Sequence, residues 1–442
     1  MKDEKKDYDV AIIGSGITGS AISYVLSNFS NVEDIAVIEK YSKVASVQSS
    51  KDNNSQTLHF GDIETNYSLE KAKKVKEGAE LVMNYLENNP KENLHSKYGK
   101  MALAIGDKEI KSLQERHKNF KKIFPNLKKL ETKEIKKKEP KVVEGRENEN
   151  LLAYYTDNGY TVDYQRLAKS FIDKSKSDLF LNSKVKEVEK TEKGYKIKTY
   201  KEEINAKVLV VAASANSLGI AHSLGYGKDL ILLPVMGDFY KSKRKLLNGK
   251  VYMMQDPKLP FAAIHGDPDV SKGSETRFGP IAQVWPVLER NNKKSFGDFL
   301  KLFQFRIDAI HAMFKQITDP TYFKFVFWNM LYSMPFFGKR LFLREVRKII
   351  PSLKPKDIEY GKNIGGIRPQ VLNVKTKKIE MGEAKIIGEN SIFNITPSPG
   401  ASVCLDNAYK DANKIIDFLN KEEEKYNFHE HKFKKDLRKR KY

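Results

Sequence analysis

Residues 8–40 read YDVAIIGSGITGSAISYVLSNFSNVEDIAVIEK, and this stretch decides the fold class. The β-branched run over 9–13 predicts a buried parallel strand, and the apolar pattern that follows the glycines predicts a helix. Between them lies the turn GSGITG at 14–19, and a second strand is predicted over 35–38. That strand ends in Glu39, twenty residues beyond the last glycine of the turn. This spacing is typical of a dinucleotide-binding βαβ unit.

Each part of the unit has a physical role in binding a dinucleotide. Gly14 permits the tight turn, Gly16 lets backbone N–H groups approach a pyrophosphate, and Gly19 lets the helix pack closely against the strand. The helix N-terminus faces the phosphates, and Glu39 can accept a hydrogen bond from a ribose hydroxyl. Because an acidic residue here disfavours a 2′-phosphate, the expected ligand is FAD or NAD rather than NADP.

Length and composition limit the remaining possibilities. At 442 residues, 40% of them hydrophobic, the chain is long enough for two domains. No apolar signal segment precedes the first predicted strand, so we expect a protein that begins in the cytosol. Cys404 is the only cysteine, which excludes an intramolecular disulfide and a cysteine-based metal cluster. The histidines show no convincing metal-ligand spacing, the pair His429-x-His431 included, and no metal is predicted.

The pattern along the rest of the chain predicts a discontinuous cofactor domain. The polar segment 41–64 is expected to run along the cofactor, and the apolar strand over 206–212 to pack close to it. A strand-rich block beginning at residue 230 and a helical, aromatic block over 300–350 are expected to form a second domain. The predicted cofactor domain comprises 1–85, 150–225 and 355–425, the predicted substrate and membrane-facing domain comprises 86–149 and 226–354, and a basic tail covers 426–442.

Several motifs in the same order resemble the glycine/D-amino-acid oxidase superfamily of FAD enzymes. Within it, the chain most resembles the malate:quinone oxidoreductase family, in its ε-proteobacterial form. The motifs are GSGITG (14–19), VIEKYSKVA (37–45), QSSKDNNSQTLHFGDIETNYS (48–68), Glu139-Pro140, LPFAAIHGDPD and TRFGP (between 259 and 280), GGIRPQ (365–370) and TPSPGAS (396–402). One position departs from the family pattern, because Ser214 stands where members usually have a glycine after the third cofactor strand.

The resemblance implies both a fold and a reaction. The fold is α/β, with a Rossmann-like FAD-binding domain and an inserted substrate domain of antiparallel sheet plus helices. The reaction is FAD-dependent oxidation of (S)-malate to oxaloacetate, with electrons passed to a membrane quinone. The implied cofactor contacts are Gly14, Gly16, Gly19, Glu39, Lys40, Ser49, Ser50, Asn54, Ser55, Gln56, Thr57, Val185, Ala213, Gly366, Pro399, Gly400, Ala401 and Ser402.

Oxidation of a 2-hydroxy acid needs a hydride acceptor, a base and a cation for the carboxylate. The resemblance places Arg368 as the carboxylate-binding cation, with a structural ion pair as the alternative. It places His265 facing the substrate as the preferred base, while His59 orients substrate or flavin, or is itself the base. Gln56 and Thr57 are expected to hydrogen-bond the second carboxylate or the flavin N5 edge. The turn over 399–402 is expected either to stabilise charge on the flavin or to be an ordinary helix start.

Two further segments predict contact with a membrane. The aromatic stretch 322–343 has its longest uncharged run over 325–338, well short of the ~20 residues that a spanning helix needs. It is expected to be either a core helix or an interfacial patch that meets quinone. The tail 432–442 carries seven basic residues against one acidic residue and is either a second anchor or a solubilising end. A peripheral protein on the inner face of the cytoplasmic membrane is therefore expected.

Two rival functions remain at this stage. An L-2-hydroxyglutarate dehydrogenase or oxidase of the same superfamily would use the same arginine and histidine, although the motifs at 52–67 favour malate. An RNA-binding flavoprotein, such as a tRNA-modifying enzyme, is suggested by the net charge of +22 and the pI of 9.5. Most of that charge is lysine interspersed with glutamate, which is typical of a solvated surface, and no RNA-binding module is recognisable.

Overall fold

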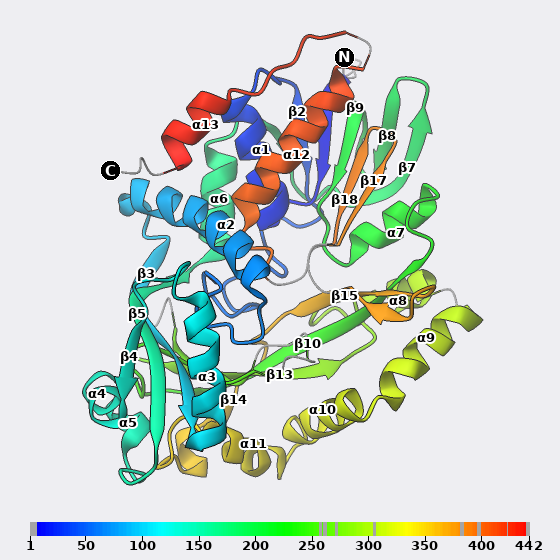
Figure 1. Ribbon diagram of the computed structural model, residues 1–442. Helices are drawn as coiled ribbons and strands as arrows, with labels where there is room; N and C mark the ends of the chain where they lie inside the picture. The colour runs from blue at the N-terminus through cyan, green and yellow to red at the C-terminus, as the bar shows by residue number, and fades with distance from the viewer. Residues whose placement is uncertain are drawn as a thin grey trace.

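The computed structural model describes residues 7–255, 259, 263–269, 273–303, 306–380, 384–395, 399–421 and 423–438. Two β-sheets dominate them, one in the upper and one in the lower half of Figure 1. Strands and helices from distant parts of the sequence build each half. The predicted α/β class with a second, largely antiparallel sheet is confirmed.

The first sheet has the parallel core that the βαβ pattern predicts. Its strand order is β17-β18-β9-β1-β2-β6, and β1 runs parallel to both of its neighbours. An antiparallel hairpin of β7 and β8 extends from β9. The strands are β1 Asp7–Ile13, β2 Ile35–Ile38, β6 Asp178–Phe180, β7 Val185–Thr191, β8 Gly194–Thr199, β9 Glu203–Val211, β17 Lys385–Gly388 and β18 Ser391–Asn394.

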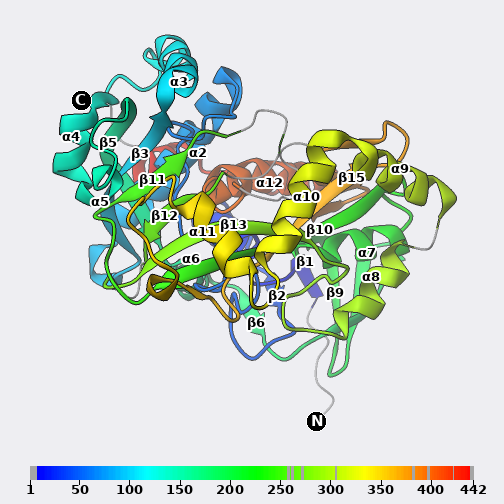
Figure 2. The same ribbon diagram turned by 90° about the horizontal axis from the view of Figure 1, so that it is seen from below.

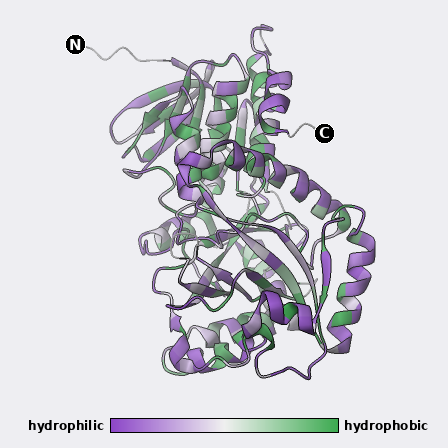
Figure 3. Ribbon diagram, turned by 90° about the vertical axis from the view of Figure 1, so that its left-hand side faces the viewer, coloured by the Kyte–Doolittle hydropathy of each residue, from purple (hydrophilic) through white to green (hydrophobic). Residues whose placement is uncertain are grey.

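The central strands are buried on both faces, which explains their unbroken apolar sequences. Val10 and Ile12 face a core formed with helices, whereas Ala11 and Ile13 face the core beneath β8 and α7, since successive side chains of a strand alternate. Hydrophobic residues gather within the sheet layers and hydrophilic residues on the outer helices (Figure 3). The helices of this half are α1 Ile17–Phe29, α2 Leu69–Asn88, α6 Tyr164–Asp173, α7 Asn216–Ser223, α12 Cys404–Leu419 and α13 Glu430–Leu437.

The second sheet has the order β16-β15-β10-β13-β12-β11-β3-β5-β4, with β14 beside β10. It is antiparallel except where β3 and β11 run parallel. The strands are β3 His95–Ile105, β4 Lys128–Glu131, β5 Leu151–Val162, β10 Leu230–Ser242, β11 Lys250–Met253, β12 His265–Pro268, β13 Thr276–Val284, β14 Glu359–Tyr360, β15 Ile367–Asn373 and β16 Lys378–Ile379.

Helices cover the face of this sheet that points away from the first sheet (Figures 1 and 2). They follow β13 along the chain and line up as α9, α10 and α11. The helix before them, α8, packs beside α7 on the opposite face, because Leu232 of β10 joins the core cluster of α8 and its neighbour Ile231 joins that of α9. The helices of this half are α3 Gly106–Phe120, α4 Thr132–Lys138, α5 Pro140–Val143, α8 Ser295–Phe303, α9 Ile307–Thr318, α10 Pro320–Tyr332 and α11 Gly338–Val346; short 3₁₀ turns lie at Pro90–Glu92 and Pro355–Asp357.

Four strands differ from the predicted segment boundaries, the short β14 and β16 and the long β5 and β15. All four belong by sequence to segments assigned to the cofactor domain, yet each is hydrogen-bonded into the second sheet. Pairing partners lie far away in sequence, so local patterns could not assign these strands to a sheet. The division into cofactor and substrate domains itself stays a prediction.

The described part of the basic tail contains a packed helix, α13. Phe433 and Leu437 lie in the core beside α1 and α2, and Asn84 donates a hydrogen bond of 2.8 Å to the carbonyl of Leu437. Phe433 and Leu437 are four residues apart, so they share the buried face of α13. The alternative of a disordered, solubilising end is therefore wrong for residues 432–438, whereas the alternative of a second membrane anchor stays a prediction. The last four residues lie outside the described part.

Candidate active site

A cavity of about 1260 Å³ is lined by residues of both sheets. Its lining includes the glycine turn with Glu39 and Lys40, and also His59 and Arg368. Its volume exceeds the ~300–1,000 Å³ common for small-molecule sites, so a large cofactor and a small substrate fit together. The cavity lies at the carboxyl ends of parallel strands, the usual binding place of such a sheet.

The glycine turn has the geometry that its sequence predicts. Gly14 has φ of +103°, and a Cβ on it would lie 2.6 Å from the carbonyl oxygen of Ala212. A Cβ on Gly19 would lie 1.9 Å from the carbonyl oxygen of Gly14, so helix and strand pack without space for a side chain. By contrast, a Cβ on Gly16 would meet Ser49 only at 3.5 Å, which leaves its backbone open to the cavity. These residues fit a dinucleotide pyrophosphate.

Glu39 is buried at the end of β2 and lines the cavity. Its Oε2 accepts hydrogen bonds from the backbone N–H and the hydroxyl of Ser15, at 3.0 and 2.8 Å, and Oε1 accepts one from the Tyr41 N–H. The carboxylate is therefore held in place beside the turn. Ser214 has φ of +55°, in the left-handed region that glycine adopts most easily, so this position suits the glycine that the family pattern leads one to expect.

Most predicted cofactor contacts line the cavity, with three exceptions. Gly19 serves helix packing, and Ser50 is set back from the wall. Gln56 is buried, and its Nε2 donates to the carbonyl of Lys51 at 2.9 Å, so its side chain holds the loop instead. Those that line the cavity are Gly14, Gly16, Glu39, Lys40, Ser49, Asn54, Ser55, Thr57, Val185, Ala213, Gly366, Pro399, Gly400, Ala401 and Ser402.

His59 lines the cavity and is paired with a buried carboxylate. Its Nδ1 lies 2.6 Å from Oε1 of Glu64. Burial would raise the pKa of Glu64, but the hydrogen bond and charge of His59, together with Lys100, lower that pKa to about 2. With Nδ1 facing Glu64, Nε2 is the imidazole nitrogen left to face a ligand. Sequence reasoning missed Glu64, although an acid five residues after a candidate histidine was a usable signal.

His265 occupies a different position from the one expected. It is only 1% exposed and is not among the described residues that line the cavity. Its ring stacks on Tyr252 with centroids 4.3 Å apart, and its Nδ1 lies 2.5 Å from Oδ2 of Asp267. Burial lowers the pKa of His265 in spite of that carboxylate. The structure therefore places His59, not His265, where a ligand could touch it.

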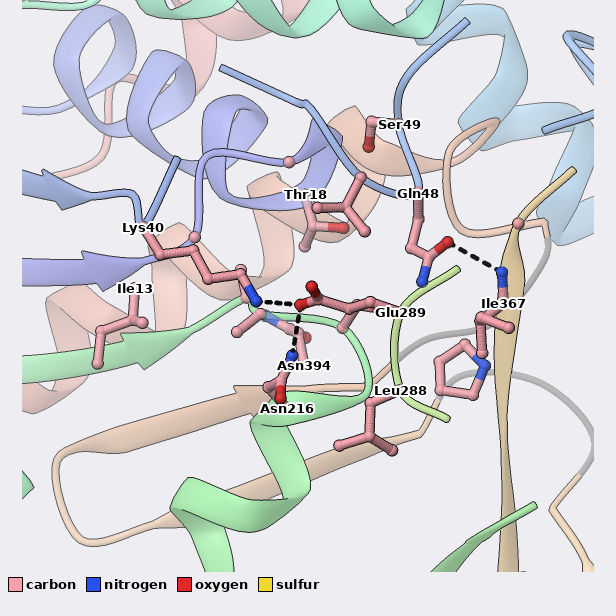
Figure 4. Close-up of a pocket in the computed structure, with 18 of the residues that line it drawn as sticks. Ile13, Thr18, Lys40, Gln48, Ser49, Asn216, Leu288, Glu289, Ile367 and Asn394 are labelled. Atoms are coloured by element: carbon pink, nitrogen blue, oxygen red, sulfur yellow. Dashed lines mark hydrogen bonds and ion pairs between the residues drawn. The ribbon is translucent and has the colours of Figure 1, made fainter. Parts of the chain in front are cut away.

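Arg368 lies on β15 and lines the cavity, half-buried. Within the part of the chain that the structure describes, no ion pair joins it to a carboxylate, which disfavours the structural ion pair considered above. Burial lowers its pKa, with Tyr67 and Tyr252 close enough to act against that shift. The adjacent N–H of Ile367 donates to Oε1 of Gln48 at 3.0 Å, which fixes the start of the strand (Figure 4).

Glu289 fastens the second half of the molecule to the first across this cavity (Figure 4). It lies between β13 and α8, and its carboxylate forms an ion pair with Lys40 at the end of β2. It also accepts hydrogen bonds from the Tyr41 hydroxyl at 2.7 Å and from the side-chain amide of Asn216 at 3.1 Å. Sequence reasoning missed this residue because Lys40, Tyr41 and Asn216 all lie more than 70 residues away from it.

The other predicted feature is the turn before α12. Residues 399–402 line the cavity, and the N–H of Ser402 donates to the carbonyl of Pro399 at 2.8 Å. The first three residues of the predicted TPSPGAS motif, 396–398, lie outside the described residues. The hydroxyl of Ser402 accepts a hydrogen bond of 2.9 Å from the N–H of His59, so the turn also supports the histidine.

Fold and site together define an α/β protein of two sheets with a dinucleotide-binding turn at the cavity between them. Among solved structures, the chain is similar to L-alpha-glycerophosphate oxidase from Mycoplasma pneumoniae, with a TM-score of 0.66, 16% identity and coverage of 93% of this chain and 95% of that one. It is also similar to glycine oxidase from Geobacillus kaustophilus, with a TM-score of 0.63, 16% identity and coverage of 92% and 94%. At these identities the likeness shows the fold alone.

Sequence comparison gives the particular family. Residues 6–430 match the sequence model of the malate:quinone oxidoreductase (Mqo) family. The chain is 41% identical to a probable malate:quinone oxidoreductase of Campylobacter jejuni over 98% of this chain and 99% of that protein. It is 41% identical to the malate:quinone oxidoreductase of Helicobacter pylori, with 98% of both chains covered. The L-2-hydroxyglutarate dehydrogenase of Dictyostelium discoideum is 28% identical over 91% of each.

The chain therefore belongs to the malate:quinone oxidoreductase family. Its activity is that of a malate dehydrogenase (quinone), an FAD-dependent oxidoreductase, and the resemblance stated from the motifs is confirmed.

Proposed function

We propose that FAD lies along the cavity with its pyrophosphate at the glycine turn, and that malate is oxidised between His59 and Arg368. The observation that carries this proposal is that one cavity is lined by a dinucleotide turn, a carboxylate-paired histidine and an arginine that forms no ion pair with the described carboxylates. Gly14, Gly16 and Glu39 would hold the cofactor. When bound, FAD supplies the hydride acceptor.

Arg368 and His59 supply the cation and the base that the reaction also needs. The planar guanidinium of Arg368 binds the carboxylate next to the hydroxyl-bearing carbon through two parallel hydrogen bonds, which fixes the face that the substrate presents. Nε2 of His59 accepts the hydroxyl proton, and the imidazolium that forms is stabilised by Glu64 at 2.6 Å. The proposed base is therefore His59, which the sequence offered as the alternative to His265. The N-terminus of α12 offers N–H groups that stabilise negative charge in the cavity.

We further propose that α9, α10 and the turn after α10 dip into an anionic bilayer. Phe336 is 98% exposed and Ile307 85%, and Phe314 of α9 and the stacked pair Phe323 and Phe327 of α10 are exposed as well. Exposed apolar patches of this kind mark interaction surfaces. The exposed cations Lys315, Lys324 and Arg340 flank the patch, as suits a headgroup boundary.

The aromatic stretch thus combines both roles expected of it. Tyr332 and Phe342 are buried in the core of the second half, whereas Phe323, Phe327 and Phe336 are exposed. None of the helices that the structure describes combines the length and apolarity needed to cross a bilayer. A peripheral mode of binding, on the inner face of the cytoplasmic membrane where quinone is dissolved, is consistent with these features.

Sedimentation with vesicles of anionic phospholipid tests the membrane surface. Phe336→Ser with Phe337→Ser should reduce the bound fraction at least severalfold, because two large apolar side chains are removed from the interface. Ile387→Ser is the matched control, since Ile387 is an exposed apolar residue of β17 in the other half of the molecule. Equal binding by the double variant and the control would overturn this part of the proposal.

A substrate panel tests the reaction. With FAD-loaded protein and a water-soluble quinone, kcat/KM for L-malate should exceed that for L-2-hydroxyglutarate, and NADH should be inert as a donor. Preferential oxidation of L-2-hydroxyglutarate would reassign the substrate.

A further inference from the structure

Two lysines lie buried side by side behind the active-site wall. Lys100 on β3 and Lys250 on β11 are partners in the parallel pairing, and each is 1% exposed. Burying an ammonium group costs several kcal/mol unless it is paired. Lys100 has a direct partner, because its Nζ lies 2.7 Å from Oδ1 of Asp62. The case of Lys250 is different.

Lys250 directs its hydrogen bond at a residue of the cavity wall. Its Nζ donates to Oγ1 of Thr57 at 3.0 Å, whereas the carboxylate of Asp267 lies 3.6 Å away. Asp267 is shared, since its other oxygen lies 2.5 Å from His265. The Asp267 carboxylate therefore neutralises the Lys250 ammonium charge only in part. The hydrogen bond of that ammonium group goes to Thr57, which lines the cavity.

These contacts decide which role the Thr57 hydroxyl can play. An ammonium group is a donor only, so it takes one lone pair of Oγ1. The Tyr252 hydroxyl lies 3.0 Å from the same oxygen, and burial raises the pKa of Tyr252 well above its usual value, so this hydroxyl stays protonated and can take the second lone pair. The hydrogen of Thr57 is then left to donate, and its present acceptor is the Ser55 carbonyl at 3.2 Å.

Malate has two carboxylates, and in the proposed function Arg368 binds the one next to the hydroxyl-bearing carbon. We infer that Thr57, with Lys250 behind it, binds the second carboxylate of malate, the one remote from the hydroxyl-bearing carbon. A hydroxyl whose oxygen accepts a hydrogen bond from an ammonium group is polarised and becomes a stronger donor, which suits it to an anionic oxygen. Gln56, the other candidate for this carboxylate, uses its amide on the Lys51 carbonyl. Lys250 acts through Thr57 and is a positioning residue. The inference rests on the proposed roles of Arg368 and His59.

A pair of substrates isolates the second carboxylate. L-2-hydroxybutyrate carries a methyl group where L-malate carries that carboxylate, and the two are otherwise alike at the reacting carbon. The measurement is the ratio of kcat/KM for malate to kcat/KM for 2-hydroxybutyrate in FAD-loaded protein. A residue that only supports the fold would lower both values and leave the ratio unchanged.

Thr57→Val and Lys250→Met should each lower this ratio about 10- to 100-fold, the range for losing a hydrogen bond to a charged group. The double variant should be no worse than the poorer single variant, because both substitutions break one interaction. Thr57→Ser keeps the hydroxyl and should keep the ratio. Lys100→Met is the matched control: it removes the neighbouring buried lysine, which bonds Asp62, and should affect both substrates equally.

An unchanged ratio in FAD-loaded Thr57→Val would overturn the inference, as would an equal fall of the ratio in Lys100→Met. If Lys250→Met does not fold, the comparison of Thr57→Val with Thr57→Ser decides alone. Failure of the wild-type protein to oxidise L-malate would instead overturn the proposed function.

Discussion

The sharpest prediction concerns which histidine accepts the substrate proton. His59→Asn keeps a polar group of similar size at the cavity wall but removes the proton acceptor. We expect the rate of flavin reduction at saturating malate to fall by ~10²–10⁴, the usual contribution of a general base. His265→Asn should lower that rate less than tenfold, because His265 is 1% exposed, stacked on Tyr252 and not among the described residues that line the cavity. The assay is anaerobic stopped-flow flavin absorbance, with FAD content measured for each variant.

Glu64→Gln refines this prediction, because the amide keeps the shape of the side chain and loses its charge. The carboxylate lies 2.6 Å from Nδ1 of His59, and both side chains are largely buried. A hydrogen bond to a charged group is worth ~1.5–3 kcal/mol, which corresponds to a rate lowered about 10- to 150-fold. A larger loss in His265→Asn than in His59→Asn, with both variants FAD-loaded, would refute the assignment.

Three other predictions follow from the same contacts. Arg368→Lys keeps the charge but loses the two-pronged geometry, so kcat/KM for malate should fall by the equivalent of ~2–5 kcal/mol while FAD content stays stoichiometric; an undiminished kcat/KM would return Arg368 to a structural role. Glu289→Gln breaks the ion pair with Lys40 across the cavity, so flavin fluorescence should report FAD release about 10- to 100-fold faster than in wild type. Asp298→Asn, at another carboxylate of the cavity wall, should not change that rate, and equal rates in both variants would exclude a special role for Glu289. Truncation after residue 428 removes the buried Phe433 and Leu437 and should lower the free energy of unfolding by ~3–6 kcal/mol, whereas truncation after residue 438 should not; equal denaturation midpoints would contradict the packing of α13.

Local sequence patterns predicted the cofactor half well because its determinants are local. Gly14, Gly19 and Glu39 have roles that depend on spacing within one βαβ unit, and the structure places them accordingly. The sheet membership of β5 and β15 depends on pairing with distant strands, so no local pattern contained it.

The two histidines show the same limit within the site. The sequence favoured His265, but its ring is stacked on Tyr252, 1% exposed and not among the described residues that line the cavity, and no local pattern contained that packing. Glu289 and Lys250 could not be found either, since each acts on a partner more than 190 residues away. Sequence reasoning judged the tail by its basic composition and therefore missed helix α13. The i,i+4 spacing of Phe433 and Leu437 is a helical periodicity that predicts such a helix.

Anaerobic mixing of the purified, FAD-loaded protein with L-malate tests the central claim most directly. One equivalent of malate should bleach the flavin absorbance, and a soluble quinone should restore it, while NADH and NADPH should leave the spectrum unchanged. Flavin that stays oxidised with L-malate and is bleached by NADH would contradict the account.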